Sequence, residues 1–67
     1  MKFKKNQKVV FDNPYIPNNL VMKVQRATYK SAGMMMVTVE LPGGSGQAYA
    51  SELRLATKAE EEKGFRH

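Results

Sequence analysis

The sequence contains no cysteine and no tryptophan, and its one histidine, His67, is the last of 67 residues. Disulfides and Cys/His zinc sites, which stabilise many domains of this size, are therefore unavailable. Nucleophilic triads need His, Cys or clustered carboxylates on a rigid frame, and a terminal His does not supply one. We expect a single small domain held together by packing, with no bound metal and no cofactor.

Long apolar segments and converging acidic groups are also missing. The longest apolar run, residues 34–37, is far shorter than the roughly 20 residues that a membrane span needs, so no membrane association is expected. The lack of cysteine fits a reducing compartment and predicts a cytoplasmic location. Glu60, Glu61 and Glu62 are adjacent in a predicted helix, where their side chains diverge. An enzyme is therefore not expected.

Basic residues are present in excess, and they are unevenly distributed. The net charge is +5, yet residues 1–30 alone hold seven Lys or Arg against Asp12, a local net charge of +6. The remaining residues, 31–67, sum to −1. Such asymmetry favours a polyanionic partner, and a lysine tail that only keeps the chain soluble is the alternative.

The first two thirds of the chain read as strands and turns. Residues 8–11 (KVVF) predict a short strand, and residues 12–19 (DNPYIPNN) predict a long loop stiffened by two prolines. Residues 20–30 and 34–41 alternate between apolar and polar positions, which predicts two strands. Because Gly33 in the intervening segment tolerates a positive φ, the two strands are expected to form a hairpin.

The rest of the chain predicts two more short strands and a helix. Residues 42–46 (PGGSG) predict an exposed turn, followed by a strand at 47–50, a 3₁₀ turn at 51–53 and a strand at 54–56. The segment from Thr57 matches a capping box for a helix of about two turns. Five short strands at this spacing predict a small closed or half-open barrel.

The helix is expected to be marginal by itself. Glu60 completes the capping box, and Gly64 is placed to end the helix. So short a helix frays unless Leu55 or Phe65 docks it. The chain is accordingly divided into a barrel, residues 1–56, and a short C-terminal helix and tail, residues 57–67.

The order of these elements resembles the SH3-like small barrels over about residues 3–56. The residues that carry the resemblance are 8–11, the hairpin segments 22–24 and 35–41, and 49–55. It implies a mainly β fold: a five-stranded SH3-like barrel with a 3₁₀ turn before the last strand and a short C-terminal α-helix. Small bacterial or bacteriophage accessory proteins have this general appearance. The predicted core is Val9, Phe11, Met22, Val24, Val37, Val39, Tyr49, Leu53 and Leu55.

Basic residues interleaved with aromatic ones make nucleic-acid binding the first functional hypothesis. Lysines neutralise phosphates in DNA or RNA, and a tyrosine ring offers a surface on which a base stacks. Alternatively, Tyr29 only packs at the hairpin end and Tyr15 plugs the mouth of the barrel. The predicted nucleic-acid-binding residues are Lys2, Lys4, Lys5, Lys8, Tyr15, Lys23, Arg26, Tyr29 and Lys30.

A protein-interaction module, or a modulator of a host or partner enzyme, is the second hypothesis. Met34 and Met36 are expected to face outward, and methionine suits surfaces that accommodate partners. Together with Tyr15 and Ile16 of the long loop they would contact a protein partner or a second copy, with the strand at 34–41 pairing or packing across the interface. The alternative is that a bent strand buries part of both its faces.

Overall fold

The computed structural model describes residues 2–66; Met1 and His67, the outer ends of the two predicted units, lie outside the described residues. It confirms a mainly β fold with one short C-terminal helix. The strands are β1 (Lys8–Phe11), β2 (Met22–Ser31), β3 (Met34–Leu41), β4 (Gly44–Tyr49) and β5 (Leu53–Leu55). A 3₁₀ turn, η1 (Ala50–Glu52), precedes β5, and the helix α1 (Lys58–Lys63) follows it.

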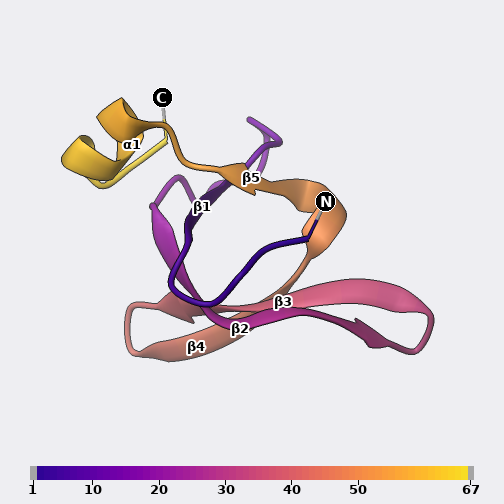
Figure 1. Cartoon of the computed structure of the whole chain (residues 1–67). Helices are drawn as coiled ribbons and strands as arrows, with labels where there is room; N and C mark the ends of the chain where they lie inside the picture. Colours follow the sequence, from indigo (N-terminus) through magenta and orange to yellow (C-terminus); the bar gives the residue numbers. More distant parts are fainter. Residues whose placement is uncertain (1, 67) are drawn as a thin grey trace.

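All five strands belong to one antiparallel sheet in the order β4-β3-β2-β1-β5. Figure 1 shows β1 and β5 lying above β2, β3 and β4. The long strand β2 joins the two layers, because its start pairs with β1 and the rest pairs with β3. Shifts of register between Val24 and Arg26, and between Arg26 and Tyr29, accompany its bend. The edge strands β4 and β5 are not paired with each other within residues 2–66, so the sheet is not closed.

The hairpin between β2 and β3 is as predicted. Ser31 and Met34 are partners, and the two residues between them, Ala32 and Gly33, have φ values of 51° and 81°. Two residues with positive φ form the type I′ turn that matches the twist of a two-residue hairpin. Gly33 adopts this conformation freely, whereas the Cβ of Ala32 makes it unfavourable.

The second hairpin is tighter than the sequence suggested. The whole segment 42–46 was expected to be a turn, but only Pro42 and Gly43 turn, and Gly44 already pairs with Leu41. The prediction was wrong because a backbone ladder needs no side chains, so glycines can extend it. Gly46 also makes room for Leu41: a Cβ at position 46 would stand 2.6 Å from Leu41 Cδ1.

The core lies between the two layers of the sheet and largely matches the prediction. Phe11 and Leu41 pack against it while partly exposed. Phe3, Ala48 and Ala50 were not predicted. The buried cluster is Phe3, Val9, Met22, Val24, Val37, Val39, Ala48, Ala50 and Leu53.

Two predicted core residues, Tyr49 and Leu55, are instead 41% and 45% exposed. Along the end of β4 the inward positions belong to Ala48 and Ala50, so the intervening Tyr49 faces outward. Leu55 ends β5, an edge strand of a sheet that does not close. Both errors come from assuming that the last strands complete a closed barrel.

The helix begins and ends as predicted. The Thr57 hydroxyl accepts a hydrogen bond from the Glu60 amide, and the Glu60 carboxylate accepts one from the Thr57 amide. Gly64 ends the helix with a φ of 83°. Beyond it, Phe65 forms an isolated β-bridge with Leu20, which ties the chain end to the start of β2. No helix within residues 2–66 is long and apolar enough to cross a membrane.

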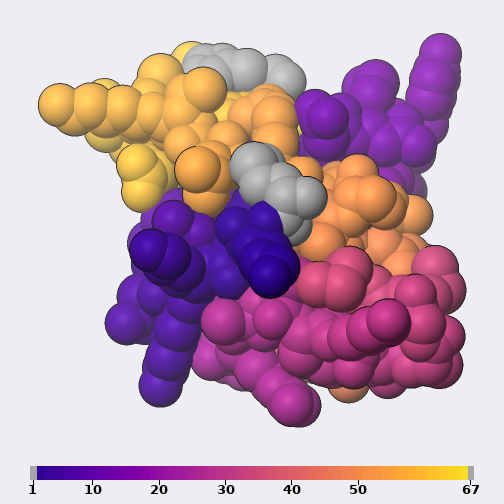
Figure 2. Space-filling view, turned by 45° about the vertical axis from the view of Figure 1, so that its right-hand side comes forward, coloured from indigo at the N-terminus to yellow at the C-terminus, as the bar shows by residue number. Residues whose placement is uncertain are grey.

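The N-terminal segment and the long loop lie in different regions of the molecule. In the space-filling view of Figure 2 the indigo N-terminal segment lies against the body of the protein. The purple loop that follows β1 forms a separate corner at the upper right. The N-terminal segment and the long loop therefore form different parts of the surface in this view.

Candidate nucleic-acid interface

The N-terminal segment, residues 3–7, is docked along β2. The Phe3 amide donates to Thr28 Oγ1 at 2.7 Å, and the Thr28 amide donates to the Phe3 carbonyl at 3.0 Å. Further along, the Asn6 amide donates to the Val24 carbonyl and the Val24 amide donates to the Gln7 carbonyl, both at 2.8 Å. With Phe3 buried in the core, the lysines around it are carried by a fixed backbone and not by a tail.

This docking fixes the direction of the first lysines. Lys2 and Lys4 flank the buried Phe3 and are exposed, as expected for an extended segment whose side chains alternate. Lys5 follows in a turn closed by the Gln7 amide donating to the Lys4 carbonyl at 3.2 Å. Asn6 takes the positive φ of this turn, 77°, which asparagine tolerates well.

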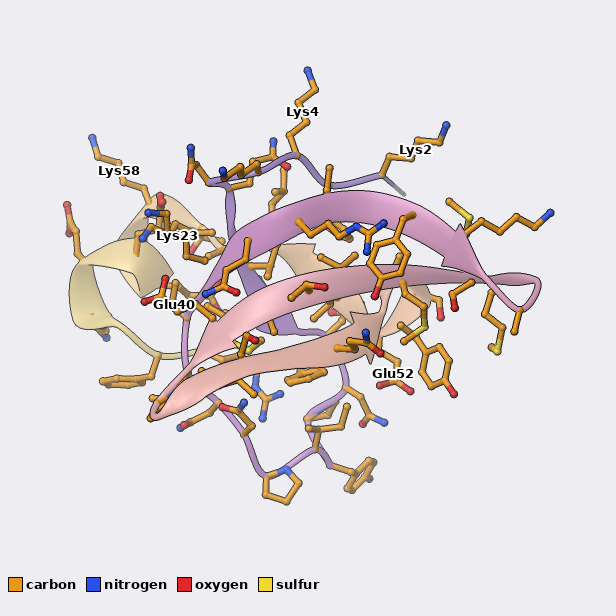
Figure 3. The ribbon with its side chains drawn as sticks, turned by 90° about the horizontal axis from the view of Figure 1, so that it is seen from below. Lys2, Lys4, Lys23, Glu40, Glu52 and Lys58 are labelled. Carbon is orange, nitrogen blue, oxygen red and sulfur yellow. The ribbon has the colours of Figure 1, made fainter. Side chains whose placement is uncertain are left out.

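Several lysines gather on one side of the molecule. In Figure 3 Lys2, Lys4 and Lys58 project from the same side with Lys23 near them, whereas Glu52 lies toward the opposite side. Lys58, in the first turn of α1, was not predicted, because the charges of the C-terminal segment balance in the sequence. We call Lys2, Lys4, Lys5, Lys8 and Lys23 the lysine face.

Lys8 and Lys23 are the most closely spaced pair of the lysine face. They are Cα partners across β1 and β2, which places their Cβ atoms about 4.5–5.5 Å apart. Like charges in this arrangement repel each other. Both side chains are exposed, and neither forms an ion pair within residues 2–66. The pair is therefore free to bind an anion.

Arg26 and Tyr29 lie further along β2 and contact each other. The Arg26 guanidinium carbon lies 4.0 Å from the centroid of the Tyr29 ring, a cation–π contact. Tyr29 is half-buried, and its hydroxyl has no hydrogen-bond partner among the described residues. The ring therefore packs at this end of the hairpin and carries Arg26 on its face, while its role in base stacking stays a prediction.

Register places Tyr29 in a row of three side chains across the sheet. Tyr29 is the partner of Met36, and Met36 is the partner of Tyr49. Since neighbouring strands lie about 4.8 Å apart, the backbones of the two tyrosines are separated by roughly 10 Å. Tyr49 thus belongs to the outer surface of β2, β3 and β4. The small residues on either side of it, Ala48 and Ala50, were the sequence signal for this orientation.

Lys30 lies near the far end of β2 from Lys23. They are seven positions apart, which is at most about 23 Å along the bent strand. Lys2 precedes Phe3, which is bonded to Thr28, so it lies toward this far end. Basic side chains consequently follow most of the length of β2.

Tyr15 is not brought together with the lysine face. It is 92% exposed, so the interpretation that it plugs the mouth of the barrel is wrong. Arg66 fixes the loop that carries Tyr15 through three hydrogen bonds. Its Nη1 donates to the carbonyls of Phe11 and Asn13 at 2.9 Å, and its Nη2 donates to the carbonyl of Ile16 at 3.0 Å. Tyr15 therefore protrudes from a fixed loop in a different region of the surface (Figure 2).

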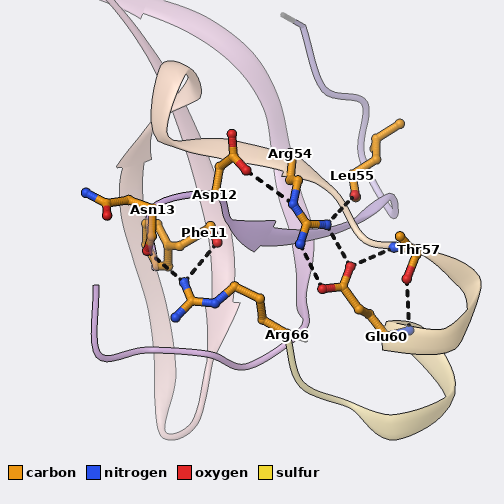
Figure 4. A network of polar contacts seen from close by, with 8 residues as sticks. All are labelled: Phe11, Asp12, Asn13, Arg54, Leu55, Thr57, Glu60 and Arg66. Carbon is orange, nitrogen blue, oxygen red and sulfur yellow. Dashed lines mark hydrogen bonds and ion pairs between the residues drawn. The ribbon is translucent and has the colours of Figure 1, made fainter. Parts of the chain in front are cut away.

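Arg54 and Arg66 have structural partners, as Figure 4 shows. Arg54 donates through Nη1 and Nη2 to the two oxygens of Glu60, at 2.7 and 2.9 Å, and its Nε lies 3.3 Å from Asp12 Oδ1. The hydrogen bond with Glu60 is the main reason that the pKa of Arg54 is raised, and desolvation opposes it. This network attaches α1 to β5 above Val10, the Cα partner of Arg54.

The residues named by the second hypothesis lie in β3 and in the long loop. Met34 is 49% exposed at the hairpin turn, while Met36 is half-buried between two tyrosines. Ile16 is half-buried in the long loop with Tyr15, whereas Met34 and Met36 belong to β3. Because β3 has β2 on one side and β4 on the other, it has no free edge to pair with a partner, and only packing across an interface stays a prediction.

No protein-family model, curated protein or solved structure matches this chain. Across residues 2–66, no group of three or more His, Cys, Asp or Glu side chains is arranged to hold a metal ion.

Proposed function

We propose that the protein binds nucleic acid without catalysis and that the lysine face contacts the phosphate backbone. The observation that carries the proposal is the docking of residues 3–7 along β2, which holds Lys2 and Lys4 on the side where Lys8 and Lys23 meet. Charges fixed in this way attract a polyanion and release its counterions on binding.

Aromatic side chains next to this surface support the same proposal. Tyr29 carries Arg26 on its ring, and Tyr49 presents an exposed ring two strands away. Stacking of a base on an aromatic ring contributes about 1–3 kcal/mol and tolerates any base. We therefore expect binding with little sequence preference, in which the lysines position the backbone and Tyr49 contacts a base.

The layout also supports an SH3-like architecture as an inference. The bent strand β2, the order of the strands and the 3₁₀ turn before β5 are its grounds. A bacterial or bacteriophage accessory role and a cytoplasmic location stay predictions of the sequence.

Fluorescence anisotropy tests the proposal directly. Labelled single-stranded DNA, duplex DNA and RNA are titrated with the protein between about 20 and 200 mM salt, the range over which phosphate contacts weaken steeply. The double variant Lys2→Gln/Lys4→Gln is compared with Lys63→Gln, a control that removes an exposed cation from the end of α1. The first is expected to weaken binding and the second to leave it nearly unchanged. Equal effects of the two variants would count against the lysine face.

A protein partner is the second candidate, favoured by one observation. Three of the exposed large apolar side chains, Met34, Met35 and Tyr49, lie toward the same end of the sheet, where Met36 is the partner of Tyr49. Contacts of this kind change little with salt. Sedimentation at several protein concentrations tests a homodimer, and the candidate is lost for self-association if the mass stays monomeric.

A further inference from the structure

A hollow of about 490 Å³ opens beside the pair formed by Lys8 and Lys23. Glu40 of β3 also lines it, and its apolar wall includes Leu20, Leu41 and Pro42. Its volume falls within the range of roughly 300–1,000 Å³ that is usual for small-molecule sites. The hollow combines charge and apolar surface, which the rest of the lysine face does not.

The hollow carries a net positive charge, since Lys8 and Lys23 stand against the single acid Glu40. Within residues 2–66, Lys8, Lys23 and Glu40 form no ion pair with one another or with any other side chain. The two ammonium groups stand on directly opposed residues of β1 and β2, and their repulsion is relieved by an anion placed between them. A terminal phosphate matches this pair because it carries close to two negative charges near pH 7.

The other sides of the hollow offer a hydrogen-bond acceptor and apolar surface, which are suited to the sugar and base of a nucleotide. Glu40 is an acceptor only, so it repels a phosphate but binds hydroxyl or amino groups that donate hydrogen bonds. Leu20, which is 39% exposed, and Pro42 offer apolar surface against which a flat ring can lie. A ligand with a phosphate at one end, donor groups and an apolar ring satisfies all three kinds of wall.

We propose that this hollow binds a phosphate monoester joined to a nucleobase. Two sources have this chemistry: a free mononucleotide, and the phosphorylated end of a nucleic-acid strand. Only the second rests on the proposed function. In that case the hollow holds the end of the strand while Lys2 and Lys4 contact phosphates further along β2.

Amide chemical-shift titration of the full chain separates these ligands. The probes are a nucleoside monophosphate, the same nucleoside without phosphate, inorganic phosphate, and one oligonucleotide with and without a 5′-phosphate. We expect the monophosphate to shift the amides of residues 20–23, 40 and 41, and the nucleoside and inorganic phosphate each to bind at least tenfold more weakly. A nucleotide that binds no better than inorganic phosphate would overturn the assignment of a base-binding wall.

Substitutions of the two lysines test whether they bind the phosphate group. Lys8→Gln/Lys23→Gln should weaken monophosphate binding at least tenfold, Lys8→Arg/Lys23→Arg should retain it, and Lys63→Gln, at the end of α1, should leave it unchanged. Glu40→Gln should tighten inorganic phosphate severalfold. Because these side chains are exposed, native chemical shifts elsewhere in each variant check the fold. The site is overturned if the Lys8/Lys23 double variant binds the monophosphate as well as the natural sequence does.

The oligonucleotide pair separates the two sources and the two proposals. Tighter binding with the 5′-phosphate, lost in Lys8→Gln/Lys23→Gln, supports the strand end. A monophosphate that binds while neither oligonucleotide does supports the free nucleotide and refutes the proposed function. Equal binding of both oligonucleotides with no shift from the monophosphate refutes the hollow and leaves the proposed function standing.

Discussion

Replacing Glu60 by glutamine should remove much of the stability of this domain. Glu60 is fully buried and accepts from Arg54 Nη1 at 2.7 Å, Arg54 Nη2 at 2.9 Å and the Thr57 amide at 2.9 Å. Glutamine has nearly the same shape, but it loses the charge and turns an NH₂ donor toward a group that is itself a donor. The substitution therefore tests the network with little change in packing.

The expected loss of stability depends on how deeply Glu60 and its partner Arg54 are buried. Breaking a fully buried ion pair costs about 3–5 kcal/mol, and a hydrogen bond to a charged group contributes about 1.5–3 kcal/mol. The Arg54 side chain is 32% exposed, so water partly compensates it, and we expect a loss of about 2–3 kcal/mol. Stability of 0.05–0.15 kcal/mol per residue gives a domain of this length roughly 3–10 kcal/mol in total.

Asp12→Asn is the matched control because Asp12 contacts the same arginine. Its oxygen lies 3.3 Å from Arg54 Nε, but its side chain is 64% exposed. Exposed ion pairs contribute about 0–1 kcal/mol, so this variant should lose no more than that. Urea denaturation followed by circular dichroism compares the free energies of unfolding. The reasoning is refuted if Glu60→Gln costs no more than Asp12→Asn.

Three further substitutions test other parts of the structure. Ala32→Gly should stabilise the protein by about 1 kcal/mol, because a residue with a Cβ is strained at a positive φ; an unchanged or lower urea midpoint would contradict the turn. Arg66→Met should speed amide hydrogen exchange in residues 12–20 without changing exchange in the β2–β3 hairpin, because it frees three carbonyls of the loop; uniform acceleration would show that the contact is not local. Phe3→Ala should cost about 3–4 kcal/mol, measured by thermal or urea unfolding, because it empties a fully buried site; a cost below about 1 kcal/mol would mean that the N-terminal segment is not docked.

Local rules predicted the elements whose causes are local. The strand at residues 8–11 follows from its composition, the first hairpin from alternation around Gly33, and the helix from the capping box at Thr57. In each case the deciding residues are within a few positions of one another. Patterns of this length are visible in the sequence without knowledge of the tertiary contacts.

The errors lie where distant segments decide the outcome. Phe3 is buried because it bonds to Thr28, 25 residues away, and no local pattern shows this contact. Tyr49 was assigned to the core through the resemblance to closed SH3-like barrels, and a strand of four residues, QAYA, is too short to show by itself which of its two sets of positions faces inward. The residues Ala48 and Ala50 occupy the core, so the tyrosine lies outside.

In the candidate site, too, local patterns predicted some features, and contacts between distant segments decide the others. Alternation correctly predicted that Lys23 and Gln25 face outward from β2, whereas the exposure of Arg26 follows a shift of register after Val24. The meeting of Lys8 with Lys23 depends on strand pairing, and the placement of Lys2 and Lys4 further along β2 depends on the docking of the N-terminal segment. The separation of Tyr15 from these lysines depends on the path of a long loop, which the sequence does not specify.

The salt dependence of nucleic-acid binding tests the central claim most directly. The logarithm of the affinity should fall linearly with the logarithm of the salt concentration, by about 0.7–0.9 for each phosphate neutralised. Replacing Lys2 and Lys4 together should therefore reduce this slope by about 1.4–1.8, with Lys63→Gln leaving it unchanged. No salt-sensitive binding of any tested DNA or RNA, or the same slope in the double variant, would contradict the account.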